Sequence, residues 1–420
     1  VAGPKVHHLS YFRRAESARP MLDALAGNNE EFERLNAPSR EHIGRGGDKV
    51  LAKDNAPIAL MLPGVMGSQL AADGDRIWFN PLRMLGGGME RLKLGAAATT
   101  AGWIDRSYDD FAKQLALSHE VRPFVYDWRL SITQAAQKFG DALDRALKDA
   151  AQRGKPLRIV AHSMGGLVAR LALKERWEKL RALPGSRLVQ FGTPNGGSHS
   201  IACVLMGRDE FVRAIAFWAD WKHDMNEFLQ IVRDFPGVLE LLPWAPADGK
   251  DYFDPDLWKQ WASADVWNKG RLPRGATEYD TAKGAPDGWP APQKGPLQAA
   301  KKAVDEIVGA PLDKQLTLYV AGRARTPVDV RVRDGQVEIG WTEEGDGRVP
   351  WATGIPPELP CWYVDAAHGS LLSHKKAFGQ YLKLIETGQC SLPTQRPLAR
   401  GERETVYAPA PVLAPALYPT

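Results

Sequence analysis

The chain has 420 residues, of which 44% are hydrophobic and 25% are charged, the ordinary balance of a globular protein with a substantial core. Lys and Arg total 54 against 50 Asp and Glu, a formal net charge of +4. Because phosphate binding needs clustered basic residues and none stand out, we expect no nucleic-acid partner.

Three cysteines, Cys203, Cys361 and Cys390, lie far apart in the sequence. Such a sparse, odd set argues against a disulfide framework, and the absence of a Cys-x-x-Cys pair argues against zinc. No apolar run reaches the roughly eighteen residues of a membrane-spanning helix. The first twenty residues also lack the apolar segment of a signal peptide. We therefore expect a cytoplasmic protein, or one peripheral at a membrane surface.

In chain order, residues 1–56 are charged and polar and are interpreted as an N-terminal extension. The short apolar run Ile58–Leu62 ends in Pro-Gly, which is typical of a buried strand that feeds a loop. A second strand is predicted over Arg122–Trp128, preceded by a helix over Tyr108–Leu117. A long amphipathic helix follows it and is predicted to end at Gly154.

Residues 156–177 then predict a strand, a sharp turn and a helix, and Arg187–Gly192 is the next strand. Strands that alternate with long helices indicate βαβ units and a mostly parallel sheet flanked by helices. Residues 57–200 are therefore interpreted as the first part of an α/β core.

The alternation stops over residues 201–312, a helical-looking insertion that holds seven of the fourteen tryptophans. Its later part, Ala276–Gly295, is rich in Gly and Pro and is interpreted as a loop. Strand signals resume at Leu316–Gly322, so residues 313–390 form the second part of the core. Within it we predict a hairpin at Asp334-Gly335, a strand over Cys361–Val364 and a helix over Leu371–Glu386. The Pro- and Ala-rich tail, residues 391–420, is expected to be extended or loosely attached.

The strongest local signal is Ala161-His162-Ser163-Met164-Gly165-Gly166, between the predicted strand and helix. A nucleophile elbow places Ser on such a tight turn and needs small residues two positions before and after it. Ala161 stands where Gly is more common. A Ser among glycines is otherwise an ordinary turn, but the flanking strand and helix favour Ser163 as a nucleophile.

A serine nucleophile needs a base, and the base needs an orienting carboxylate. In the α/β-hydrolase fold the chain order is Ser, then Asp or Glu, then His. Asp346 lies between two glycines after the predicted hairpin, although an Asp-Gly turn alone is a structural alternative. His368, in the loop after the last strand, is preferred as the base over His374, which we expect within the following helix; Asp365 is interpreted as a loop residue.

The oxyanion hole needs two backbone N–H donors. Met164, directly after the nucleophile, is expected to supply one. The loop Leu62–Ser68 is expected to supply the other, from Val65 in the first place and Met66 in the second, with an ordinary Pro-Gly turn as the alternative.

With these residues assembled, the chain resembles the lecithin:cholesterol acyltransferase family, whose relatives include phospholipases and bacterial lipase-like proteins. The resemblance spans about residues 57–390 and rests on Pro63–Leu70, Ile77–Pro81, Tyr126–Ser131, Gly192–Ser198, Phe235-Pro236, Leu241–Pro243 and Gly345–Gly347. It implies an α/β-hydrolase fold, a Ser163–Asp346–His368 triad and a mobile lid over a lipid site. From the residues themselves, Asp127 and Arg129 are expected to form an ion pair that holds the oxyanion loop or the lid.

Three functions remain open: hydrolysis of lipid acyl esters, acyl transfer through the same acyl-enzyme, and an inactive hydrolase fold that serves as an interaction module. The expected partner is a lipid or acyl-ester substrate, with possible transient contact to a membrane surface. Trp218 and Trp221 are candidate lid and substrate-binding residues, although the tryptophans of the insertion can equally form its own core. No metal or organic cofactor is expected.

Overall fold

A computed structural model describes residues 55–78, 80, 88–209, 225–246, 249–264, 289–397 and 405–409. These residues all belong to one compact unit, Gly44–Thr420. The expected N-terminal extension lies outside the described residues except for its last two positions, and so do Trp218 and Trp221.

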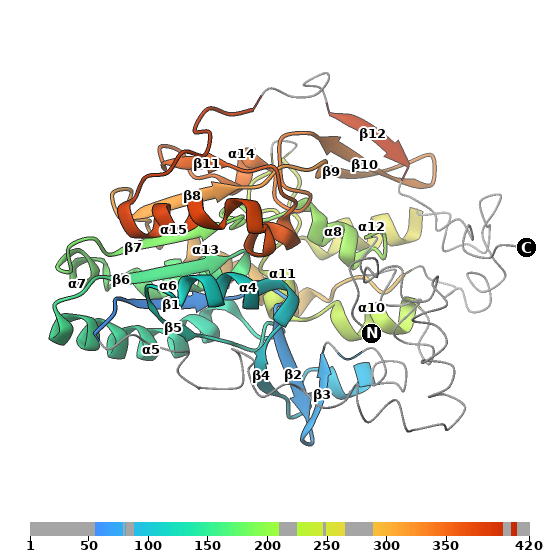
Figure 1. The fold of residues 1–420 in the computed structure, drawn as a ribbon. Helices are drawn as coiled ribbons and strands as arrows, with labels where there is room; N and C mark the ends of the chain where they lie inside the picture. Colours follow the sequence, from blue (N-terminus) through green and yellow to red (C-terminus); the bar gives the residue numbers. More distant parts are fainter. Residues whose placement is uncertain are drawn as a thin grey trace, which may run out of the picture. The chain divides into compact units, whose positions relative to one another are not determined.

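The core is a six-stranded, fully parallel sheet (Figure 1). Its order is β11-β8-β7-β6-β1-β5, with β1 Ile58–Leu62, β5 Glu120–Pro123, β6 Leu157–His162, β7 Arg187–Phe191, β8 Thr317–Ala321 and β11 Cys361–Tyr363. The chain runs outward from β1 to β5, returns to β6 on the other side of β1, and continues through β7 and β8 to β11. The loops that leave β1 and β6 therefore diverge at one point, where ligands bind in open α/β sheets.

Helices cover both faces of this sheet, which explains why β1 is apolar throughout and why every residue of β1 and β6 is buried. α5 (Ile132–Arg153), α6 (Met164–Leu173) and α13 (Lys294–Val308) pack on one another in one layer. α4 (Asp105–Leu115) and α15 (Phe378–Thr387) form the other, where Phe111 contacts Phe378 and Tyr381. This arrangement is the predicted α/β-hydrolase fold, which is confirmed. The shorter helices of the described residues are α7 Trp177–Arg181, α8 His199–Leu205, α10 Met225–Val232, α11 Pro236–Leu239, α12 Pro255–Ala264, α14 Trp351–Gly354 and the 3-10 turns η2 Gly88–Leu92, η5 His368–Ser373 and η6 Lys375–Ala377.

Two small antiparallel sheets flank the core, one below it and one above it in Figure 1. The first, β3-β2-β4, consists of β2 Ser68–Ala72, β3 Asp75–Trp78 and β4 Thr99–Trp103 and was not predicted. The second, β12-β10-β9, contains the predicted hairpin: β9 Thr326–Arg333 and β10 Gln336–Thr342 meet at Asp334 and Gly335, both with positive φ. From the tail, β12 (Val406–Pro409) is extended and pairs with β10.

Two predicted elements have the wrong bounds. The strand expected over Arg122–Trp128 is β5, which ends at Pro123, because the chain then turns to bond the start of β2: the Tyr126 N–H donates to Ser68 Oγ over 3.2 Å. The helix expected from Leu371 begins at Phe378. His374 has ψ of 82°, which is not helical, and separates two 3-10 turns instead of lying within a helix.

The described part of the insertion is helical, as predicted, but Gly295 lies inside α13 and not in a loop. Trp261 and Trp289 each pack edge to face on Trp258, and all three are almost completely buried. For these three tryptophans the interpretation as the insertion's own core is therefore correct. No helix among the described residues is long and apolar enough to cross a bilayer.

Glu240 joins the insertion to the core. Its side chain is 1% exposed, and Oε2 accepts the N–H of Ile132, at the start of α5, over 2.6 Å. Burial raises the pKa of Glu240 from its ordinary 4.5 to about 7. Because the folded pKa is the higher one, the protonated carboxyl stabilises the fold at low pH, and this contribution is lost as the pH rises through 7.

We expect Glu240→Gln, which stays neutral, to become more stable relative to wild type as the pH rises. The difference between about pH 5 and pH 8 should be on the order of 3 kcal/mol in the free energy of unfolding, measured by urea denaturation. A variant whose difference from wild type is the same at both pH values would contradict this role of Glu240.

Candidate functional site

Ser163 lies on a sharp turn between β6 and α6, at the carboxyl edge of the sheet. Its backbone has φ 52° and ψ −127°, a conformation that residues other than glycine rarely adopt. The Ser163 N–H donates to the Phe191 carbonyl over 2.9 Å, and its carbonyl accepts the N–H of Gly166 over 2.9 Å. The turn is thus bonded on both sides, which holds a strained residue in place.

The small residues around Ser163 are needed for space. A Cβ on Gly165 would lie 2.6 Å from the Pro63 carbonyl oxygen, and one on Gly166 would lie 1.9 Å from Thr193 Oγ1. Ala161, two residues before the serine, is fully buried. The elbow therefore packs directly against the loops after β1 and β7, as the spacing of small residues predicts.

The structure brings Ser163, His368 and Asp346 into one hydrogen-bonded chain. His368 Nε2 is 2.9 Å from Ser163 Oγ, and His368 Nδ1 is 2.7 Å from Asp346 Oδ2. A carboxylate accepts from Nδ1–H, so in the neutral imidazole Nε2 carries the lone pair that faces the serine hydroxyl. Ser163 and Asp346 are 4% and 2% exposed, which shields both from water.

Asp346 is fixed by its own loop. Its Oδ1 accepts the N–H groups of Arg348 (3.0 Å) and Val349 (2.7 Å), which leaves Oδ2 for the imidazole. A backbone bridge to Ala324 places Asp346 beside the end of β8, after the chain has made the β9–β10 excursion. The His368 N–H donates to the Asp346 carbonyl over 2.7 Å. The two residues are therefore joined through backbone as well as side chain.

The predicted oxyanion loop lies directly over the nucleophile. A Cβ on Gly64 would be 2.8 Å from Ser163 Cβ and 3.3 Å from Ser163 Oγ. The Gly64 and Gly67 N–H groups are engaged by Tyr108 and by the Gly64 carbonyl. Within the described residues, the N–H groups of Val65, Met66 and Met164 have no such acceptor. Val65 and Met164 thus remain the preferred donors, with Met66 as the alternative.

The Tyr126–Ser131 segment clamps this loop. Tyr126 Oη donates to the Pro63 carbonyl over 2.8 Å, and Trp128 Nε1 donates to the Ser68 carbonyl over 3.2 Å. Asp127 and Arg129 form the expected ion pair at 2.6 Å, and Arg129 Nη1 donates to the Leu92 carbonyl over 2.7 Å. The ion pair holds the end of η2, between β3 and β4, while the two aromatic residues hold the predicted oxyanion loop.

Other candidates lie away from this arrangement. Asp365 is exposed, as expected of a loop residue, and His374 is half-buried without a hydrogen bond to Ser163 or Asp346. Cys203, Cys361 and Cys390 are free thiols. Among the described residues, no group of three His, Cys, Asp or Glu side chains has the arrangement to hold a metal ion.

Sequence reasoning missed Tyr108 and His162, which lie beside the site. His162 precedes the nucleophile, and its Nδ1 lies 3.0 Å from Tyr108 Oη. The signal that could have identified His162 is a polar side chain at the end of a predicted core strand, where a buried imidazole requires partners.

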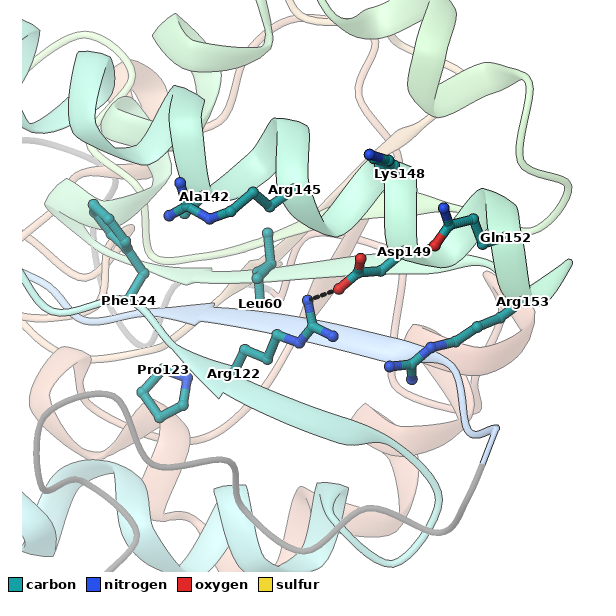
Figure 2. Close-up of a pocket in the computed structure, with 10 residues that line it drawn as sticks. All are labelled: Leu60, Arg122, Pro123, Phe124, Ala142, Arg145, Lys148, Asp149, Gln152 and Arg153. Atoms are coloured by element: carbon teal, nitrogen blue, oxygen red, sulfur yellow. Dashed lines mark hydrogen bonds and ion pairs between the residues drawn. The ribbon is translucent and has the colours of Figure 1, made fainter.

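A separate surface groove lies on the other side of β5, against α5 (Figure 2). Cationic side chains dominate its lining, but Arg122 is paired with Asp149 at 2.7 Å and with Glu120. The lining residues are Leu60, Arg122, Pro123, Phe124, Ala142, Arg145, Lys148, Asp149, Gln152 and Arg153. None belongs to the Ser163 site.

Gly192 offers a test of the geometry. Its φ is +58°, and a Cβ there would lie 2.8 Å from Asp346 Oδ2 and 3.0 Å from His368 Nδ1. We expect Gly192→Ala to separate these two atoms and to slow labelling of Ser163 by a fluorophosphonate about a hundredfold. The matched control is Gly154→Ala, with φ +60° but no atom within 4 Å of the new Cβ. Both variants should lose about 1 kcal/mol of stability to backbone strain. Equal labelling rates for the two would contradict the assigned geometry.

In a comparison with known protein families, the part of the chain that contains Ser163 matches a family model. Residues 116–273 match the family model for lecithin:cholesterol acyltransferase. The chain is also similar to the uncharacterized protein YJR098C of Saccharomyces cerevisiae, with 26% identity over 152 residues, which are 36% of this chain and 22% of that protein. The chain thus spans about a fifth of the length of this curated relative.

Solved structures include similar chains. Bacillus licheniformis lipase BlEst2 in its mature form is 13% identical, with 80% of this chain and 94% of that chain covered and a TM-score of 0.35. An alpha/beta hydrolase fold protein from Burkholderia ambifaria is 13% identical, with 80% and 92% covered and a TM-score of 0.34. A membrane phospholipase A described as a bacterial virulence factor is 12% identical, with 87% and 97% covered and a TM-score of 0.31.

The matched segment contains the Tyr126–Ser131 motif, the Ser163 elbow and the Gly192–Ser198 loop. The resemblance to the lecithin:cholesterol acyltransferase family is thereby confirmed over residues 116–273, and it supports an enzyme that acts on esters.

Proposed function

We propose that this protein is a serine hydrolase that cleaves acyl esters of lipids through an acyl-enzyme on Ser163. The observation that carries the proposal is the hydrogen-bonded chain from Ser163 Oγ through His368 to Asp346, at the divergence of the loops after β1 and β6. A serine hydroxyl without a base is a poor nucleophile, and here a base and its orienting carboxylate are both within hydrogen-bonding distance.

In the proposed acylation step, His368 Nε2 takes the proton of Ser163 as Oγ attacks the ester carbonyl carbon. Asp346 holds the imidazole through Nδ1–H and stabilises the imidazolium that forms. The carbonyl oxygen becomes an oxyanion, and the Val65 and Met164 N–H groups are assigned to it. His368 then gives its proton to the leaving alcohol oxygen, which breaks the ester bond and leaves the acyl group on Ser163.

Water resolves the acyl-enzyme by the same steps in reverse order. His368 takes a proton from the attacking water, the tetrahedral intermediate collapses, and the proton returns to Ser163 Oγ as the fatty acid leaves. The same two N–H donors, of Val65 and Met164, and the same base, His368, thus serve both halves of the proposed reaction.

The family match supports a lipid as the ester, since residues 116–273 carry both the elbow and part of the insertion. The second candidate function is transfer of the acyl group to an alcohol. It differs only in the nucleophile that resolves the acyl-enzyme. Incubation with a phospholipid and a long-chain alcohol separates the two: free fatty acid as the product supports hydrolysis, and a new ester supports acyl transfer.

We expect Ser163→Ala to fold normally and to lose roughly a million-fold in the turnover of 4-nitrophenyl esters. Asp346→Asn should lose about ten-thousandfold, because the imidazole is no longer held in the required tautomer. His368→Ala should be as inactive as Ser163→Ala, whereas His374→Ala serves as the matched histidine control and should retain wild-type activity. An active His368→Ala with an inactive His374→Ala would overturn the assignment of the base.

A fluorophosphonate probe tests the alternative of an inactive hydrolase fold. Covalent labelling of wild type that disappears in Ser163→Ala supports the enzyme. A wild-type protein that is not labelled and turns over no ester would leave the fold as an interaction module and refute the proposal.

If the insertion contacts lipid, activity on long-chain esters should rise when the substrate passes from monomers to vesicles. Trp218 and Trp221 lie outside the described residues, and their replacement by Ala tests this contact directly. We expect the pair of substitutions to reduce turnover of vesicle lipid more than turnover of a short soluble ester. Equal losses on both substrates would assign the two tryptophans to the insertion's core.

A further inference from the structure

Three hydrogen bonds run behind Ser163 and none belongs to the proton transfers proposed above. The Gly64 N–H donates to Tyr108 Oη over 3.0 Å, Tyr108 Oη lies 3.0 Å from His162 Nδ1, and His162 Nε2 lies 3.0 Å from the His368 carbonyl oxygen. Tyr108 and His162 are 3% and 7% exposed. The series therefore forms a buried path from the loop after β1 to the base.

The direction of each bond follows from the chemistry of the partners. A carbonyl oxygen only accepts, so His162 Nε2 must carry a proton. Burial lowers the pKa of His162 to about 3, so the imidazole is neutral and its Nδ1 is an acceptor. Tyr108 Oη accepts from Gly64 and donates its own proton to Nδ1; burial raises the pKa of this phenol, which keeps the proton in place. Every donor and acceptor in the path is thereby used once.

The two ends of this path are the two parts of the site that must keep a fixed position relative to Ser163. Gly64 directly precedes Val65, the preferred oxyanion donor. His368 is the base, and its backbone N–H is already bonded to the Asp346 carbonyl. The rings of His162 and His368 also pack together, with centroids 4.9 Å apart. A shift of Tyr108 or His162 would therefore move one part relative to the other.

We propose that Tyr108 and His162 are positioning residues, which join the oxyanion loop to the backbone of the base through the Gly64–Tyr108–His162–His368 hydrogen bonds. This inference rests on the proposed function of Ser163. It assigns to the residue before the nucleophile, and to a tyrosine on α4, a role in catalysis without contact with the substrate. The Tyr108 hydroxyl does more than fill space. Its removal leaves the buried Gly64 N–H and the buried His162 Nδ1 without partners.

The first test compares two buried tyrosines. Tyr108→Phe removes the hydroxyl at the centre of the path. Tyr381→Phe is the matched control: its hydroxyl is buried without a hydrogen-bond partner among the described residues, and its ring packs on Phe111 of the same helix, α4. We expect Tyr108→Phe to lower kcat for a short 4-nitrophenyl ester about ten- to a hundredfold with KM changed less than twofold. Tyr381→Phe should leave both constants within twofold of wild type.

The second test removes the hydrogen bonds of the two His162 ring nitrogens separately. In His162→Asn the side-chain amide stands near the position of Nδ1, which keeps an acceptor for Tyr108 but loses the bond to His368. In His162→Gln the amide reaches the position of Nε2 and keeps a donor for the His368 carbonyl. Each should lower kcat, because each interrupts the path at one end. The double variant Tyr108→Phe/His162→Gln should lose no more than its worse single variant, since both break the same connection. Losses that multiply would overturn the path.

Hydrogen exchange separates failure of this inference from failure of the proposed function, because it needs no activity. Peptides that cover residues 62–68 should exchange faster in Tyr108→Phe than in wild type, with no such change in Tyr381→Phe. Wild type inert toward esters, yet with this exchange pattern, would refute the hydrolase and retain the connection. Active wild type with Tyr108→Phe equal to Tyr381→Phe in kcat and exchange would retain the hydrolase and refute the connection. If Tyr108→Phe does not fold, His162→Gln decides by the same two measurements.

Discussion

The close contact between Gly64 and Ser163 is the constraint on which the rest of the site depends. Two loops leave neighbouring strands, β1 and β6, in opposite directions, and they meet where a Cβ on Gly64 would be 2.8 Å from Ser163 Cβ. A strained serine with φ of 52° keeps that conformation only if its surroundings over-determine it. Gly165 against the Pro63 carbonyl and Gly166 against Thr193 supply the remaining walls. Ser163 is therefore oriented by direct contact with the glycine backbone of the neighbouring loops, with no side chain in between.

A loop in such close contact must itself be held, and three aromatic residues hold it from different elements. Tyr126 binds the Pro63 carbonyl, Trp78 Nε1 donates to the Met66 carbonyl over 2.8 Å, and Tyr108 binds the Gly64 N–H. Each contributes a polar atom at the end of a large buried ring, so the bond and the packing fix the loop together. These partners engage the Pro63 and Met66 carbonyls and the Gly64 N–H, whereas the N–H groups of Val65 and Met66 have no backbone acceptor among the described residues.

Local sequence patterns could predict the parallel strands and the elbow because burial on both faces and the need for small residues are properties of neighbours in sequence. The positions of Ser163, Asp346 and His368 followed from their place after predicted strands, and the structure brings them together. Their catalytic roles stay predictions. The end of β5 at Pro123 was not predictable, because Tyr126 leaves the sheet to bind Ser68, 58 residues earlier. The β2–β4 sheet was missed for the same reason, since its pairing is fixed by contacts distant in sequence.

Arg348 connects Asp346 to the beginning of the insertion. Its backbone N–H donates to Asp346 Oδ1, and its partly exposed guanidinium forms an ion pair with Asp209, in the segment that follows α8. Asp346 and the beginning of the insertion thus share one residue, whereas the backbone of Ser163 is bonded to β7 and α6. Asp209 is the more buried partner, so loss of the Arg348 guanidinium would leave a largely buried carboxylate uncompensated. The first residues of the insertion are therefore joined to the loop that carries Asp346 through a single side chain.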